Sequence, residues 1–307
     1  MLDLLSLQKA GYMKSLNKEF TLLSVESILE ILDKNNYTVE RMFTREGFAI
    51  NLDIVRKNAP SGLIEMIQIP FYINDNRILR VLSGSVRLDL NLTEYELSAG
   101  DIVLLREGAS FEVKEVSEDA SAEALVFFHG AINFSYSSDS VVLVHPQNEE
   151  WNEISHIFYT IYSFAARLPY RPEIVEPLIQ SLVNYILTLE RRINTTQDST
   201  ASSIFNRFIT ELNLNKNGKM SVTYYADRLC ISPQYLSRIV SQVSGKTASD
   251  WINKAVITEA RILLRNTSSA ISDIAESLNF PNDSFFCRFF KRKTGQTPTE
   301  YRKSAQK

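Results

Sequence analysis

Two arginines, Arg238 and Arg288, lie fifty positions apart in segments whose apolar residues repeat with helical spacing. An arginine on an exposed helix face can donate two hydrogen bonds to O6 and N7 of guanine, and so distinguish one base pair from another. Polar residues share the predicted face of each arginine: Gln234, Ser237 and Ser241 in the first segment, and Asp283, Ser284, Cys287 and Lys291 in the second. This pattern is typical of helices that read the edges of bases.

The C-terminal third of the chain contains this segment twice. The residues matched at an offset of fifty are Gly245 and Gly295, Thr247 and Thr297, and Trp251 and Tyr301. Those matched at an offset of 49 are Ala226 and Ala275, Leu229 and Leu278, and Ile231 and Phe280. The change of offset predicts that the second turn is one residue longer. Each copy is predicted to be a helix–turn–helix, the unit that places a helix in the major groove of DNA.

Seven helices are predicted in this third of the chain. We expect them near 203–214, 222–229, 233–244, 248–265, 271–278, 282–293 and 298–304. The helix over 248–265 joins the two repeats and would be about 27 Å long at 1.5 Å per residue. Successive major grooves on one side of a duplex lie about 34 Å apart. One chain can therefore present two reading helices to adjacent grooves.

Charge is divided unevenly along the chain. Residues 201–307 hold 16 basic and 8 acidic residues, whereas residues 1–200 hold 17 basic and 28 acidic residues. The balance is +8 for the first group and −11 for the second, which indicates that only the C-terminal part meets a polyanion. The basic run that includes Lys291 and Arg292 is suited to neutralising phosphates without reading sequence.

The N-terminal part has a different pattern. Short apolar or alternating runs from Phe48 to His129 are separated by turn residues, which predicts a sandwich or barrel of β-strands. Ser83-Gly84-Ser85 is predicted to be a hairpin turn. Residues 1–20 are predicted to be an arm and 24–34 a helix. After His145-Pro146 the spacing becomes helical over 148–166 and 172–192.

The expected fold class is therefore α+β, with two domains. The first, 1–193, combines a barrel or sandwich over about 40–135 with helices over about 148–192. A polar stretch over 194–202 is predicted to be a linker. The second domain, 203–307, is expected to be all-α and to hold both helix–turn–helix units.

Several classes of protein are disfavoured. No uncharged apolar run reaches the roughly 18 residues of a membrane span, and the N-terminus lacks the pattern of a secretory signal. Cys230 and Cys287 make neither a disulfide framework nor a zinc pattern, so we expect a cytoplasmic protein. The three histidines lie in separate predicted elements, and no catalytic motif is present. We therefore expect no metal, no cofactor and no enzymatic activity.

Over about residues 203–304 the chain resembles the AraC/XylS family of bacterial transcription regulators. The resemblance rests on Ile274-Ala275, Leu278, Phe280, Asp283-Ser284, Phe286, Arg288, Phe290-Lys291, Gly295, Thr297-Pro298 and Tyr301-Arg302. It implies that the protein binds double-stranded promoter DNA, with RNA polymerase as a further partner. The positions that it implies face the bases are Gln234, Ser237, Arg238, Ser284, Cys287 and Arg288. It also implies that Lys291, Tyr301 and Arg302 contact the DNA backbone.

More loosely, the N-terminal part is similar to the cupin-like effector domain of many such regulators. The similar stretches are 80–85 and 97–105. The similarity implies a small-molecule effector and a homodimer formed through residues 148–192; Phe71, Tyr72 and Phe128 are candidates for lining an effector cavity. Two alternatives remain: a cupin-type enzyme with an accessory helical domain, and a protein that binds no ligand and acts through protein contacts. The strands that would carry a cupin metal site lack histidine, which argues against the enzyme.

Overall fold

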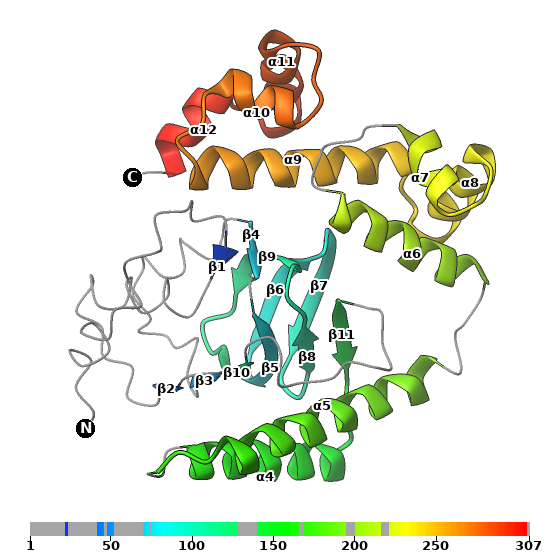
Figure 1. The fold of residues 1–307 in the computed structure, drawn as a ribbon. Coiled ribbons are helices and arrows are strands. Elements are labelled where there is room, and N and C mark those ends of the chain that lie inside the picture. Colours follow the sequence, from blue (N-terminus) through cyan, green and yellow to red (C-terminus); the bar gives the residue numbers. More distant parts are fainter. Residues whose placement is uncertain are drawn as a thin grey trace.

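The computed structural model describes residues 22–23, 42–45, 48–51, 70–73, 75–127, 140–165, 167, 169–194, 200–215 and 221–305. Our predictions for the arm at 1–20, the helix at 24–34 and the side chain of Phe128 lie outside the described residues. Two sheets lie between a pair of helices on one side and the C-terminal helices on the other (Figure 1).

The sheets are made of neighbouring antiparallel strands, except that β1 runs parallel to β4. The first sheet has the order β1 (Leu22–Leu23), β4 (Phe71–Ile73), β9 (Ser110–Val116), β6 (Ser85–Leu90) and β7 (Thr93–Ser98). The second has the order β11 (Val141–Val144), β8 (Ile102–Leu105), β5 (Asn76–Ser83), β10 (Ser121–Phe127), β3 (Phe48–Asn51) and β2 (Met42–Arg45). The predicted β-structure is confirmed, as two sandwich-like sheets rather than a closed barrel.

The prediction of a hairpin at Ser83-Gly84-Ser85 is wrong. Strands β5 and β6, which Gly84 separates, pair with different strands in different sheets, so the chain crosses between layers at this residue. Gly84 has φ +65°, and a Cβ atom there would lie 2.6 Å from the backbone nitrogen of Ala120. A glycine is needed because another segment passes so close. Such a crossing uses the same turn residues as a hairpin, so the sequence alone does not distinguish the two.

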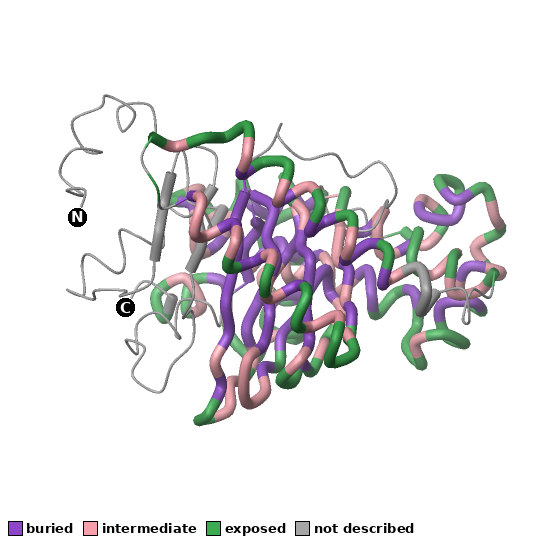
Figure 2. Tube along the Cα trace, turned by 90° about the horizontal axis from the view of Figure 1, so that it is seen from below, coloured by how far each residue is buried: buried purple, intermediate pink, exposed green. Residues whose placement is uncertain are grey.

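Helices α4 (Asn148–Ala165) and α5 (Pro172–Asn194) cover the second sheet (Figure 1). Their apolar faces and the face of that sheet turned toward them, away from the first sheet, form one buried cluster, to which Ile154 and Phe158 of α4, Leu182 of α5 and Leu125 of β10 belong. Figure 2 shows this buried interior along the strands, with exposed residues at the loop ends. Most of the apolar residues predicted to form a stripe on each helix therefore pack within the chain.

A buried ion pair lies where the second sheet meets α4. Arg80 on β5 donates from Nε to the carboxylate of Glu123 on β10 at 2.7 Å, and both side chains are 1% exposed. Arg80 also donates to Ser155 Oγ at 2.6 Å, and its guanidinium lies 4.5 Å from the centre of the Phe158 ring. The ion pair thus anchors α4 to the sheet.

The seven C-terminal helices were predicted to within about three residues at each end. They are α6 (Thr200–Leu214), α7 (Val222–Arg228), α8 (Pro233–Ser244), α9 (Ala248–Asn266), α10 (Ile271–Ser277), α11 (Asp283–Thr294) and α12 (Pro298–Ala305). Because α5 ends at Asn194 and α6 begins at Thr200, both ends of the stretch predicted as a linker are helical.

Among the described residues, none of the helices combines the length and the apolar character that crossing a membrane requires.

Candidate nucleic-acid interface

Both helix–turn–helix units turn in the same way. Cys230 and Asn279, 49 residues apart, adopt the left-handed conformation with φ of 57° and 58°. The next residue in each case donates its amide back into the preceding helix: Ile231 to the carbonyl of Ala226 at 3.0 Å, and Phe280 to that of Ala275 at 2.9 Å. The two repeats are therefore one local structure formed twice.

The second helix of each unit begins and ends with matching caps. Ser232 Oγ accepts the amide of Tyr235 at 3.2 Å, and Asn282 Oδ1 accepts the amide of Phe285 at 3.0 Å. Each helix ends in a left-handed glycine, Gly245 or Gly295. Four residues separate α7 from α8 and five separate α10 from α11, as the change of offset predicted.

The predicted reading faces are oriented away from the cores. Helix α8 buries Leu236, Ile239 and Val240, and α11 buries Phe286, Phe289 and Phe290. On the opposite faces Gln234, Arg238, Ser284 and Arg288 are exposed, whereas Ser237 and Cys287 are half-buried. Burial, followed by the nearby Asp283 carboxylate, raises the pKa of the Cys287 thiol. That thiol packs against the core, so it is a poor group for reading bases.

The two arginines are held by aromatic rings. Arg238 lies 5.1 Å from the centre of the Tyr235 ring, and Arg288 lies 4.7 Å from that of Phe285. Within the described ranges no carboxylate forms a salt bridge with either arginine. Each guanidinium is thus positioned at the surface without having its charge neutralised there.

The residues predicted to contact the DNA backbone fall into two groups. Lys291 and Arg292 are exposed in the last turns of α11. The half-buried side chains of Tyr301 and Arg302 instead hold α12 against α9: the Tyr301 hydroxyl accepts from Arg261 Nε at 3.1 Å, and Arg302 Nε donates to the carbonyl of Leu264 at 3.1 Å. Lys291 and Arg292 therefore lie on the surface, whereas Tyr301 and Arg302 make contacts within the domain.

Helix α9, which joins the two units, also contacts the first sheet. This contact was not predicted from the sequence. Arg261 makes a two-pronged pair with the carboxylate of Glu112 on β9 at 2.8 and 3.0 Å. Lys254 donates to Asp89 of β6 at 2.9 Å and to the carbonyl of Leu92 at 2.7 Å. These two basic residues are therefore paired inside the chain and do not belong to the charge available to a polyanion.

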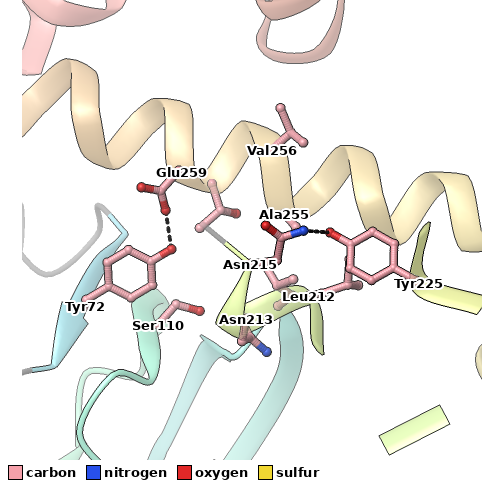
Figure 3. Close-up of a pocket in the computed structure, with 11 residues that line it drawn as sticks. Tyr72, Ser110, Leu212, Asn213, Asn215, Tyr225, Ala255, Val256 and Glu259 are labelled. Atoms are coloured by element: carbon pink, nitrogen blue, oxygen red, sulfur yellow. Dashed lines mark hydrogen bonds between the residues drawn. The ribbon is translucent and has the colours of Figure 1, made fainter. Parts of the chain in front are cut away.

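A small crevice lies between α9, α6 and the first sheet (Figure 3). The Tyr72 hydroxyl donates to the carboxylate of Glu259 across it. Burial, with the Glu259 charge, raises the pKa of Tyr72 well above its usual value; burial also raises the pKa of Tyr225 to about 12. The crevice has an interior volume of about 10 Å³, roughly the space for one water molecule.

Two of the candidate effector residues, Phe71 and Tyr72, do not line the same crevice. Tyr72 lines it, whereas Phe71 belongs to the core between the two sheets, where its ring centre lies 5.2 Å from that of Phe111. Neighbouring residues on a strand point to opposite faces, which separates the two side chains. Within the described residues, this crevice does not accommodate an organic effector.

Comparisons with known proteins place the C-terminal part of the chain. Residues 225–304 match the family described as a helix-turn-helix domain. An uncharacterised HTH-type transcriptional regulator, YpdC of Escherichia coli K12, is 22% identical over 172 residues, covering 54% of this chain and 60% of YpdC. The bifunctional transcriptional activator/DNA repair enzyme AdaA of Bacillus subtilis is 30% identical over 117 residues, or 38% of this chain and 56% of AdaA. The chain thus spans a little over half the length of these relatives.

Among solved structures, fatty-acid-bound ToxT of Vibrio cholerae covers 85% of this chain and 96% of its own, with 16% identity and a TM-score of 0.42. The resemblance to AraC-type regulators inferred from the sequence is confirmed for the helix–turn–helix region.

Proposed function

We propose that this chain, whose residues 225–304 form an AraC-type helix–turn–helix domain, is a sequence-specific DNA-binding regulator of transcription. The observation that carries the proposal is the repeated pair of capped helices, each exposing an arginine on the side opposite its buried face. Helix α9 is 19 residues long, or about 28 Å. It joins the two reading units, and its length is comparable with the spacing of adjacent major grooves, about 34 Å.

In this proposal the exposed residues of α8 and α11 read bases. Arg238 and Arg288 donate to guanine, while Gln234, Ser237 and Ser284 supply shorter polar contacts. Cys287 contributes through its shape rather than through hydrogen bonds, because its thiol packs against the core. Lys291 and Arg292 bind phosphates. Tyr301 and Arg302 support this surface by fixing α12, and their exposed portions face the DNA backbone.

The phosphate role of Lys291 leads to a distinct expectation. Lys291→Ala should weaken binding to every duplex by a similar factor and lower the slope of log affinity against log salt by about one, because one counterion fewer is released. Affinity titrations at several salt concentrations, on a selected site and on a scrambled one, measure both quantities. A loss confined to the selected site would instead make Lys291 a base-reading residue.

We further propose that the N-terminal sheets form an effector domain for a small molecule and that α9 transmits its state. An effector can change DNA binding only if it favours one of two arrangements of the chain. The paired contacts of Arg261 with Glu112 and of Lys254 with Asp89 join this domain to the helix that separates the reading units. A shift of β6 or β9 would therefore move α9.

The contact between Arg261 and Glu112 can be tested without knowing the effector. Glu112 is buried, and Arg261 is held at two points. Glu112→Gln should cost about 1–3 kcal/mol, since one charged hydrogen-bond partner is lost, and should increase amide hydrogen exchange in α9. Glu94→Gln on β7, where the glutamate side chain is 56% exposed, should change nothing. Unchanged exchange in Glu112→Gln would refute the role of this contact.

We propose a cytoplasmic homodimer that contacts RNA polymerase and has no catalytic activity. Most apolar residues of α4 and α5 are buried within one chain, so the dimer contact would use what stays exposed, such as Tyr159 at 47% exposure. Sedimentation of the full chain at tens of micromolar tests this assembly; a strict monomer would contradict it.

A further inference from the structure

One aromatic ring on the second reading helix, that of Phe285, is exposed to water, which is unfavourable for an apolar group. Phe285 is 51% exposed, although Phe286, Phe289 and Phe290 on the same helix are buried and form the core with Phe280. Phe285 is the third residue of α11, and its amide is fixed by the Asn282 cap at 3.0 Å. In helix–turn–helix proteins the first residues of this helix meet the base edges.

The ring is also part of an ordered pair. The Arg288 guanidinium lies 4.7 Å from the centre of the Phe285 ring, one helical turn away. The first unit has the same arrangement fifty residues earlier, with Arg238 5.1 Å from the centre of the Tyr235 ring. Tyr235, however, is half-buried and carries a hydroxyl group, so the second unit exposes more apolar area than the first at this position.

We infer that Phe285 is a specificity-determining residue that contacts the C5 methyl group of a thymine, next to a guanine bound by Arg288. The inference rests on the proposed function and names one more reading residue for it. The thymine methyl is the apolar group that the major groove offers, and phenylalanine is a side chain suited to contact it. Because the ring lies against Arg288, the two side chains read adjacent base pairs as a unit.

This assignment explains why the ring stays at the surface. The aromatic core of the second unit is complete without it, since Phe280, Phe286 and Phe290 already pack with ring centres 5.2 to 5.8 Å apart. Contact with a methyl group removes part of the exposed ring from water, which favours the complex. A polar side chain at position 285 would lose that gain.

The test compares thymine with uracil, which lacks only the C5 methyl group. The full chain first selects its preferred site from a random duplex library, and each thymine of that site is then replaced by uracil. At one thymine the wild-type protein should lose about fourfold in affinity, the size expected for one buried methyl group. Phe285→Ala and Phe285→Gln should lose nothing further at that position, while Phe285→Tyr and Tyr235→Ala should keep the wild-type response there.

Two results separate the possible failures. If the wild-type protein and both Phe285 variants respond alike to uracil at every position, the assignment of Phe285 is overturned while the proposed function stands. If the library yields no preferred sequence at all, the proposed function is wrong and the inference falls with it. Circular dichroism of the two variants, matched to that of the wild type, shows that the comparison concerns folded protein.

Discussion

Replacing both Arg238 and Arg288 by alanine should reduce binding to a selected DNA site by about 2–6 kcal/mol relative to random DNA. Each guanidinium is expected to contribute about 1–3 kcal/mol of discrimination, and the two contributions add because the residues lie in separate units. Both side chains are exposed, so their removal leaves the cores intact. Competition titrations with labelled site and unlabelled random duplex measure the difference.

The control for the double variant is Arg87→Ala. Arg87 lies on β6, is 45% exposed and pairs with Glu115, so its loss removes one positive charge outside the helix–turn–helix units. It should leave the preference for the selected site unchanged. If the double variant instead binds selected and random DNA with equally reduced affinity, the arginines bind phosphates and do not read bases.

The largest expected change in stability comes from Glu123→Gln. This substitution leaves the buried guanidinium of Arg80 without its carboxylate, and an unpaired buried charge costs about 3–5 kcal/mol. The free energy of unfolding can be followed by urea titration in a Trp251→Phe background. There Trp151, whose ring centre lies 5.4 Å from the Arg80 guanidinium, is the remaining tryptophan.

Two further variants separate the charge from its surroundings. Replacing Arg80 and Glu123 together by leucine should cost less than Glu123→Gln, because no buried charge is then left unpaired. Glu115→Gln breaks an ion pair of the same type at the surface, where Glu115 is 65% exposed, and should cost at most about 1 kcal/mol. Equal losses for Glu123→Gln and Glu115→Gln would show that burial does not set the strength of the Arg80 pair.

The C-terminal domain was predictable because its signals are local. Ser232-Pro233 and Gly245 mark the two ends of α8 by capping chemistry alone, and Asn282 and Gly295 do the same for α11. The repeat then indicates which residues share a face, because matched core positions fifty residues apart have the same place and the same burial in the two units. Half-burial of Cys287 was not predictable, because it depends on how closely α11 packs against its neighbours.

The N-terminal part was harder because its signals are not local. Gly84 has the sequence context of a hairpin, yet the pairing of β5 and β6 with different strands decides its role. Arg80 stands within an apolar strand, which hints at a buried partner, but nothing in the sequence identifies Glu123. Likewise Arg261 and Glu112 are 149 residues apart, so only the packing of α9 on the first sheet brings them together.

In the proposed complex, one chain places two reading helices, connected through α9, in neighbouring major grooves. Inserting five base pairs between the two halves of a selected site tests it most directly, because the insertion turns one half to the opposite side of the duplex. Affinity should fall to that of a site with only one half, and Arg288→Ala, which already weakens binding to its half of the site, should respond less to the insertion than the wild type does. Equal affinity of the full chain for the original and the lengthened site would contradict this arrangement.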